Sequence, residues 1–214
     1  MTTMQQVSLD DASVWELACK DLARRDPVMA ERISQAGSER LTGKGDPFRT
    51  LVRSIVGQQI SVKAADAIWQ RLMAICPDCL PAEIAALGET SLASCGLSKR
   101  KIDYLQDLAF HFLARKIRID CWKDMSDEEV IADLVQVRGI GRWTAEMFLI
   151  FNLLRPNVLP VDDVGLQKAV STLYFSGQPV SRSEVRKIAG NWEPWCTVAT
   201  WYLWRSLTPL PVEY

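Results

Sequence analysis

The chain has 214 residues, of which 48% are hydrophobic and 24% charged. This composition is typical of a soluble globular protein with one sizeable core or two lobes of one. The formal net charge of −1 argues against binding nucleic acid through a broad cationic face. No apolar run is long enough to span a membrane, and the first residues carry no signal-peptide pattern. We therefore expect a cytoplasmic protein, nucleoid-associated in a bacterium or nuclear in a eukaryote.

Six cysteines are scattered through helical patterns, which suits a reducing compartment. Cys76 and Cys79 have the spacing of half a zinc site, but no second pair or histidine stands at zinc-finger spacing. The sequence leaves the role of this pair open, and we expect both thiols to be inert. His111 lies in a helical pattern and lacks the context of a zinc deaminase site, so we interpret it as a surface or core residue.

Helical periodicity runs through almost the whole chain, and alternating strand patterns are missing. Start signals include Asp46 before Pro47 and the capping box of Ser126 with Glu129. The pattern predicts an all-α fold of about ten helices, with the apolar segment 142–154 as a central buried helix. We expect a compact two-lobed bundle with a cleft between the lobes, forming a single functional unit. One lobe would cover about 46–136, and the other would combine the N-terminal helices with about 145–214. The predicted helices cover 11–25, 46–57, 61–73, 81–87, a short turn ending at 96, 98–112, 126–135, 142–154, 162–174, 181–190 and 194–207.

A glycine hairpin lies between two of these helices, in the sequence VRGIGRWTA from Val137 to Ala145. Gly139 and Gly141 allow backbone angles that a side chain would forbid, and they let a phosphate approach the main-chain N–H groups. The helix that follows directs its positive N-terminal end to the same point. Arg142 could add a cation and Thr144 a hydroxyl donor. A single G-x-G is weak evidence, but the whole pattern predicts a helix-hairpin-helix DNA-binding element.

Two adjacent acids, Asp162 and Asp163, open the next predicted helix. One of them could simply be the N-cap, but two acids exceed that need. A carboxylate in a desolvated cleft could instead stabilise a developing sugar oxocarbenium ion and align a water molecule, as in glycoside hydrolysis. Spacing alone leaves both interpretations open.

Four segments together carry a resemblance to a known family: IVGQQIS at 55–61, the hairpin at 137–145, LPVDDVGL at 159–166, and NWEPW with WYLWR near the C-terminus. The sequence resembles the helix-hairpin-helix DNA glycosylase superfamily, and within it the alkylation-repair branch, DNA-3-methyladenine glycosylase II, over roughly residues 45–206. The resemblance implies that Asp163 is the catalytic carboxylate, because Leu166 follows it at the third position, and that Asp162 is a cap or a supporting acid.

The resemblance also assigns residues around the base. Trp143 stands where bifunctional relatives have a lysine nucleophile, which implies a monofunctional enzyme that forms no Schiff base. Trp143 and Trp204 match pocket positions whose rings stack on a flipped base and attract cationic alkylpurines. Met147 replaces a tyrosine that lines this pocket in some relatives. Gln58 and Gln59 fall where relatives insert a wedge into the gap left by the flipped nucleotide.

The resemblance further implies the partners and cofactors. No cofactor is required, and the iron–sulfur cysteines of some relatives are missing, since only Cys196 lies in that region. Carbonyls of Val135, Val137 and Ile140 could hold Na⁺ or K⁺ at the hairpin. We expect a monomer that binds damaged double-stranded DNA and excises 3-methyladenine and 7-methylguanine in base excision repair. The alternatives are a glycosylase for hypoxanthine or ethenoadenine, and a non-catalytic module that senses distorted duplex.

Overall fold

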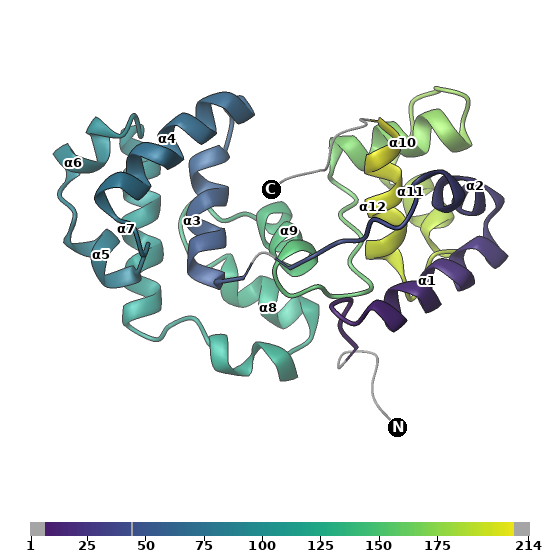
Figure 1. Ribbon diagram of the computed structural model, residues 1–214, viewed down its shortest axis with the longest axis horizontal. Helices are drawn as coiled ribbons and strands as arrows, with labels where there is room; N and C mark the ends of the chain where they lie inside the picture. The colour runs from purple at the N-terminus through teal and green to yellow at the C-terminus, as the bar shows by residue number, and fades with distance from the viewer. Residues whose placement is uncertain (1–6, 44, 208–214) are drawn as a thin grey trace. The chain divides into compact units, whose positions relative to one another are not determined.

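The computed structural model describes residues 7–43 and 45–207, and these residues form an all-helical fold without strands (Figure 1). The predicted fold class is thus confirmed, whereas the expected number of about ten helices is too low. The described residues contain twelve α-helices and one 3₁₀ helix. In chain order they are α1 Ala12–Arg25, α2 Pro27–Gln35, α3 Pro47–Gly57, α4 Val62–Ile75, α5 Pro81–Ala86, α6 Glu89–Ser94, α7 Lys99–Leu113, η2 Ile119–Asp124, α8 Asp127–Leu134, α9 Arg142–Phe151, α10 Val164–Tyr174, α11 Arg182–Ala189 and α12 Cys196–Leu207.

Helix α2 is one of the two elements that the sequence prediction missed. Its N-cap is Asp26, whose Oδ1 accepts hydrogen bonds from Val28 N at 2.9 Å and Met29 N at 3.3 Å. Pro27 occupies the first helical position, where its missing N–H costs nothing. The same aspartate–proline signal correctly predicted α3 after Asp46, so it could have predicted α2 as well.

The other missed element is η2, which is held in place by tertiary contacts with α8. Asp133 on α8 is only 1% exposed. Its Oδ2 accepts hydrogen bonds from Trp122 Nε1 at 2.9 Å and from Arg118 N at 2.8 Å. These bonds hold the segment around η2 against α8, because a buried carboxylate must be satisfied by donors. Local sequence does not show this partnership.

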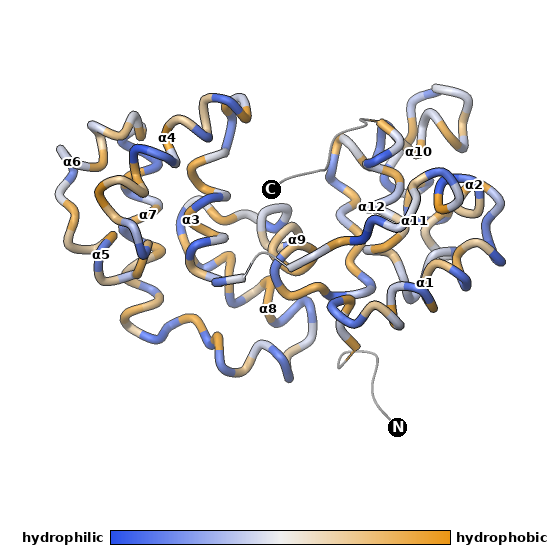
Figure 2. The backbone as a smooth tube through the Cα atoms, in the orientation of Figure 1, coloured by the Kyte–Doolittle hydropathy of each residue, from blue (hydrophilic) through white to orange (hydrophobic). Residues whose placement is uncertain are grey.

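By its internal contacts the chain divides into two compact units, and the boundary falls within α9, after Phe148. The described part of the first unit comprises 7–43 and 149–207, and that of the second comprises 45–148. Amphipathic helices, with hydrophobic and hydrophilic residues interspersed along the backbone, make up both units (Figure 2). None of the described helices is long and apolar enough to cross a membrane.

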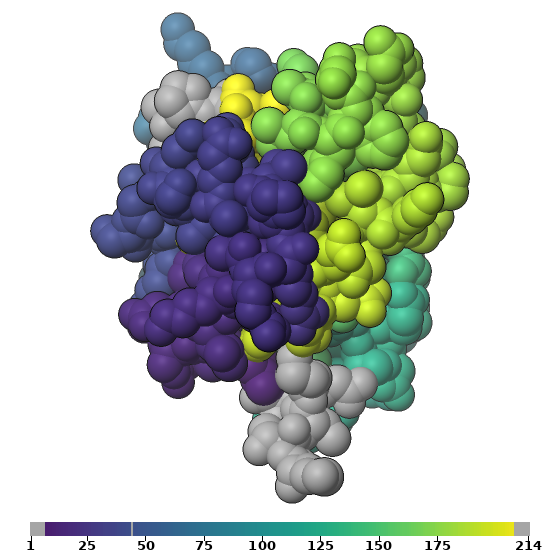
Figure 3. All heavy atoms as spheres, turned by 90° about the vertical axis from the view of Figure 1, so that its right-hand side faces the viewer, coloured from purple at the N-terminus to yellow at the C-terminus, as the bar shows by residue number. Residues whose placement is uncertain are grey.

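In the first unit, helices from the two ends of the described chain lie together, because α1 and α2 pack against α12 (Figure 3). Asp26 Oδ2 accepts hydrogen bonds from Tyr174 Oη at 2.7 Å and from Trp192 Nε1 at 3.0 Å. Thus one buried carboxylate links the start of α2 to the end of α10 and to the segment before α12.

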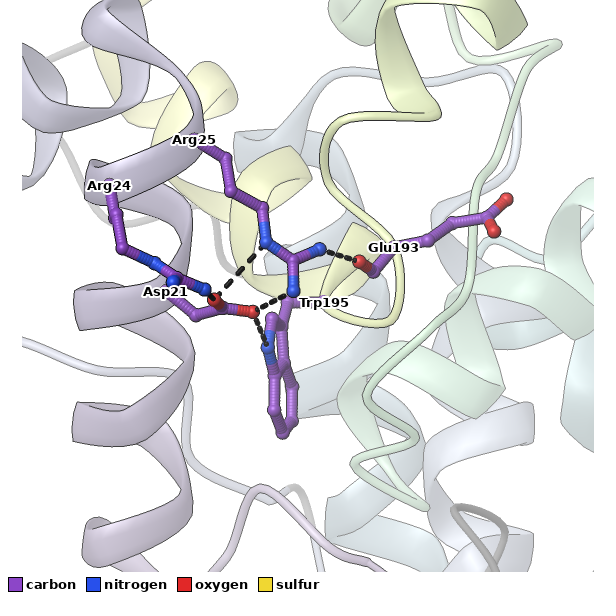
Figure 4. Close-up of polar contacts among 5 residues, drawn as sticks. All are labelled: Asp21, Arg24, Arg25, Glu193 and Trp195. Atoms are coloured by element: carbon purple, nitrogen blue, oxygen red, sulfur yellow. Dashed lines mark hydrogen bonds and ion pairs between the residues drawn. The ribbon is translucent and has the colours of Figure 1, made fainter.

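A second carboxylate, that of Asp21 on α1, makes a similar connection at the surface of the first unit. Asp21 accepts hydrogen bonds from Trp195 Nε1 at 3.1 Å and from Arg24 at 2.7 Å (Figure 4). Arg25 pairs with the same carboxylate and donates to the Glu193 carbonyl oxygen at 2.5 Å. These contacts fix the segment that leads into α12.

In the second unit, α7 packs against α3 and α5 (Figure 1). Phe48 on α3 meets Phe112 on α7 edge to face, with ring centroids 4.9 Å apart. The prediction of a central buried helix is confirmed by α9, whose residues from Thr144 to Phe151 are all buried.

Candidate DNA-binding hairpin and carboxylate site

The hairpin between α8 and α9 is a tight turn closed by its own backbone. Val137 N donates to Leu134 O, and Ile140 N donates to Val137 O, both at 3.1 Å. Gly139 has φ +88°, in the region that favours glycine. A Cβ at Gly139 would also lie 2.1 Å from Cδ2 of Tyr104, closer than any real contact. The predicted backbone requirement for glycine is therefore confirmed at Gly139.

The same prediction is wrong for Gly141. Its φ is not positive, and a Cβ placed there would meet no atom within 4 Å. The backbone therefore does not need glycine at this position. The absence of a side chain at Gly141 leaves open space beside the first turn of α9. The amide groups of that turn have no partner within the helix.

Side chains from α3 and α7 fasten the hairpin. Gln58 Nε2 donates to the Gly139 carbonyl oxygen at 2.9 Å. Arg138 N donates to Asp107 Oδ2 at 2.8 Å. Gln58 therefore contacts the hairpin, whereas Gln59 is exposed, with a left-handed φ of 58°. Sequence reasoning missed Tyr104 and Asp107, which lie thirty or more residues before the hairpin and show no local signal.

Arg142, predicted to offer a cation to phosphate, is already paired with two carboxylates. Its Nη1 donates to Glu128 Oε2 at 2.9 Å, and its Nε donates to Glu146 Oε1 at 3.0 Å. A further hydrogen bond joins Nη2 to Glu128 Oε1. The hydrogen bonds from Arg142 lower the pKa of Glu128, so this carboxylate stays ionised at neutral pH. The sequence could not show that α8 supplies this partner.

Removing the Glu128 charge should leave Arg142 paired only with Glu146, and its Nη1 and Nη2 groups should then be available to DNA. We expect Glu128→Gln to tighten binding to duplex DNA by about two- to tenfold at low salt, because an exposed ion pair is weak and phosphate can replace it. The slope of log affinity against log salt concentration should steepen by about one unit. Fluorescence anisotropy titrations at several salt concentrations measure both effects. Glu129→Gln, which lies on the same helix outside the Arg142 pair, is the matched control.

Asp163 lies at the start of α10 in the first unit and is 9% exposed. Its Oδ1 accepts two hydrogen bonds, from Leu166 N at 2.6 Å and from Trp204 Nε1 at 2.7 Å. Asp163 is therefore itself the N-cap, and the alternative that Asp162 caps this helix is wrong. Asp162 is exposed and pairs with Arg182.

The surroundings of this carboxylate are closely fitted. A Cβ at Gly165 would lie 3.0 Å from Asp163 Oδ1 and 3.2 Å from Trp204 Cδ1. Trp204 stacks on Phe151, with ring centroids 5.7 Å apart and planes 10° from parallel. The sequence assigned Trp204 to base stacking, and the structure adds its hydrogen bond to Asp163. Gly165 was missed, because only the fold brings α12 against it.

The loop that leads to Asp163 is tied to α12. Thr197 is fully buried. Its Oγ1 donates to the Arg155 carbonyl oxygen at 2.5 Å and accepts from Val158 N at 3.0 Å. Gln167 Nε2 donates to the Val161 carbonyl oxygen at 2.8 Å. These bonds fix the backbone that leads into Asp162 and Asp163, from α12 through Thr197 and from α10 through Gln167.

Comparison with known proteins identifies the family of the chain. The family model described as HhH-GPD superfamily base excision DNA repair protein matches residues 52–194. The chain belongs to this superfamily. It is 35% identical to DNA-3-methyladenine glycosylase 1 of Schizosaccharomyces pombe, in an alignment that covers 76% of this chain and 73% of that protein.

Solved structures of superfamily proteins share the fold. A DNA-3-methyladenine glycosidase from Bacillus halodurans superposes with a TM-score of 0.81 and 35% identity, covering 94% of this chain and 91% of that one. The S. pombe 3-methyladenine DNA glycosylase in complex with abasic DNA superposes with a TM-score of 0.78 and 32% identity. That comparison covers 88% of this chain and 95% of the S. pombe chain.

The remaining superfamily positions on α9 differ in exposure. Trp143, at the place of the lysine nucleophile in bifunctional relatives, is half-buried. Thr144 is 6% exposed and Met147 is 2% exposed, so little of either side chain reaches the surface. Their assignments to phosphate binding and to the base pocket remain predictions.

Cys76 and Cys79 are both buried and unpaired by a disulfide. Burial raises the pKa of the Cys76 thiol to about 12 and that of Cys79 to about 11. Cys76 Sγ donates to Glu83 Oε2 at 3.2 Å. Both thiols thus stay protonated at neutral pH, which makes them poor nucleophiles. Across residues 7–43 and 45–207, no group of three or more His, Cys, Asp or Glu side chains is placed to hold a metal ion.

Proposed function

We propose that the protein is a monofunctional DNA glycosylase that excises alkylated purines from damaged duplex DNA, with 3-methyladenine as the main substrate and 7-methylguanine as a second. The observation that carries the proposal is the Asp163 carboxylate, held by two N–H donors at the start of α10. The names of the similar proteins from S. pombe and B. halodurans support the substrate class. We further propose that it acts as a monomer in the compartment that holds the genomic DNA.

Asp163 would act by electrostatic stabilisation. The bond between the sugar C1′ and the base breaks with both electrons leaving on the base, which neutralises an alkylpurine cation. Positive charge then develops on the sugar, and a fixed carboxylate stabilises it. Water adds to C1′ and releases its proton to solvent. Because a cationic alkylpurine is already a good leaving group, the site needs to supply only modest catalysis.

Trp143 supports the monofunctional part of the proposal. An indole cannot form the Schiff base that a lysine forms at this position, so the product would be an intact strand with an abasic site. Trp143 and Trp204 would offer aromatic faces to the flipped base, each worth on the order of 0.5–2 kcal/mol for a cationic purine. Met147 at the pocket position would then adjust the base preference. Asp162 would support the turn through its pair with Arg182.

The hairpin would anchor the strand beside the lesion. Phosphate would approach the N-terminal amides of α9 across the open space at Gly141, with Arg142 and Thr144 beside it. Gln59, exposed at the end of α3, is then the wedge, while Gln58 holds the hairpin. Carbonyl oxygens are the ligands of a hard monovalent cation, which would add positive charge for the phosphate. Those of Val135, Val137 and Ile140 would hold Na⁺ or K⁺, and the Val137 oxygen also accepts from Ile140 N.

The hydrogen bond from Trp204 to Asp163 leads to a separate prediction. Trp204→Phe keeps a ring that can stack on Phe151 but loses the N–H donor. We expect the single-turnover rate of 3-methyladenine release to fall about tenfold, with DNA affinity within about twofold of wild type, because one charge-assisted hydrogen bond is lost. A full rate in Trp204→Phe would mean that only the ring of Trp204 matters.

A base-release screen on duplex DNA with single lesions tests the proposed function. The panel contains 3-methyladenine, 7-methylguanine, hypoxanthine and ethenoadenine, and released bases are quantified by mass spectrometry. We expect release of the alkylated purines and no covalent adduct after borohydride treatment. Release of only hypoxanthine or ethenoadenine would show that the substrate is one of these bases and not an alkylated purine. A trapped adduct would refute the monofunctional assignment. Binding without any release would identify a non-catalytic module that senses distorted DNA.

A further inference from the structure

Three polar or aromatic side chains form one stripe on α7 in the second unit. Lys101, Tyr104 and Asp107 are spaced three residues apart, so they share a face of the helix. All three are half-buried. Each contacts either the hairpin or the last turn of α3, which leads into residues 58–61.

Lys101 acts at the end of α3. Its Nζ donates to the Val56 carbonyl oxygen at 2.7 Å, two residues before Gln58. The last carbonyls of a helix have no partner within the helix, so this lysine satisfies one of them and complements the negative helix end. Lys101 thereby fixes the end of α3, from which residues 58–61 continue.

Tyr104 and Asp107 act on the hairpin. The ring of Tyr104 occupies the space where Gly139 would carry a Cβ, with Cδ2, Cγ and Cε2 all within 2.6 Å of that position. Asp107 Oδ2 accepts from Arg138 N at 2.8 Å, and its Oδ1 lies 3.4 Å from Arg138 Nε. Helix α7 thus holds Arg138 and Gly139 by packing and by hydrogen bonding.

Gln58 completes the connection, because its Nε2 donates to the carbonyl oxygen of Gly139 at 2.9 Å. The end of α3 and the hairpin are therefore joined directly through Gln58 and indirectly through α7. The direct route ends at Gly139, and the route through α7 ends at Arg138 and Gly139. None of these contacts uses the catalytic carboxylate.

We propose that Lys101, Tyr104, Asp107 and Gln58 are positioning residues that hold residues 58–61 and the hairpin residues 137–141 as one preformed DNA-binding surface. This inference rests on the proposed function, since it assumes that both segments contact DNA. A preformed surface binds more tightly because ordering its parts costs nothing at the moment of binding. The wedge and the phosphate anchor then meet the strand at a fixed spacing.

The test separates DNA affinity from the chemical step. Affinity is measured by fluorescence anisotropy with a duplex containing a tetrahydrofuran abasic analogue, and the chemical step by single-turnover 3-methyladenine release at saturating protein. We expect Asp107→Ala and Gln58→Ala each to weaken binding about five- to tenfold, with the saturating rate within about twofold of wild type. The double variant should bind much like the weaker-binding single variant, because the two bonds hold the adjacent hairpin residues Arg138 and Gly139.

Matched variants distinguish this role from general stability. Asp103→Ala on α7, whose carboxylate pairs with Lys99, and Gln70→Ala at an exposed position of α4 should bind as wild type does. Asp107→Asn, which keeps an acceptor for Arg138 N, should recover most of the affinity. Tyr104→Leu should weaken binding, whereas Tyr104→Phe, which keeps the ring atoms at Gly139, should stay within about twofold of wild type.

Several outcomes would overturn the inference. These are wild-type affinity in Asp107→Ala, independent effects in the double variant, and a saturating rate that falls together with affinity and melting temperature. If the wild-type protein itself neither binds the duplex nor releases the base, the proposed function fails and the inference falls with it. The wild-type measurement therefore distinguishes the two failures.

Discussion

Asp163→Asn should slow single-turnover base release by roughly 100- to 1,000-fold, which is the usual cost of losing one electrostatic stabiliser of a transition state. Asparagine is as good an N-cap as aspartate, so α10 should keep its start. Its amide oxygen can still accept from Leu166 N and Trp204 Nε1, which now donate to Asp163 Oδ1. The variant therefore removes the negative charge and preserves the local structure.

The neighbouring acid provides a matched control for this experiment. Asp162 is exposed and pairs with Arg182, so Asp162→Asn should keep the release rate within about twofold to threefold of wild type. Both variants should unfold close to the wild-type temperature and bind duplex DNA with similar affinity. If Asp162→Asn abolishes release and Asp163→Asn does not, the assignment of the catalytic carboxylate is wrong.

The fold was predictable from sequence where helix starts carry local signals. The Asp46–Pro47 pair and the Ser126–Glu129 capping box mark the starts of α3 and α8, since each needs only neighbours within four residues. The Asp26–Pro27 pair was overlooked although it has the same chemistry. By contrast, η2 depends on the buried carboxylate of Asp133, which no local pattern identifies.

The candidate site was predictable to a similar extent. The glycine hairpin and the aspartate pair are visible as short motifs, but their partners come from distant parts of the chain. Arg142 looks like a free cation in the sequence, because Glu128 lies fourteen residues earlier on another helix. Similarly, spacing cannot decide between Asp162 and Asp163 as the cap, which the fold resolves in favour of Asp163.

Gly139 and Gly141 look equivalent in the sequence, and their alanine variants should behave differently. Gly139→Ala should destabilise the protein by about 1–3 kcal/mol, because φ is +88° and the new Cβ would lie 2.1 Å from the Tyr104 ring. Gly141→Ala should change stability by less than about 0.5 kcal/mol, since a Cβ there meets nothing within 4 Å. Urea unfolding followed by circular dichroism measures both changes.

The DNA affinity of the same two variants tests whether phosphate uses the open space at Gly141. We expect Gly141→Ala to weaken binding to duplex DNA by about tenfold or more despite its normal stability, because a methyl group would keep phosphate from the N-terminal amides of α9. Gly139→Ala should lose both stability and affinity, since the turn itself must move. Wild-type affinity in Gly141→Ala would contradict the proposed phosphate approach, and it would leave Gly139 as the one hairpin glycine with a physical requirement. The pair thus separates a glycine that shapes the backbone from a glycine that makes room for a ligand.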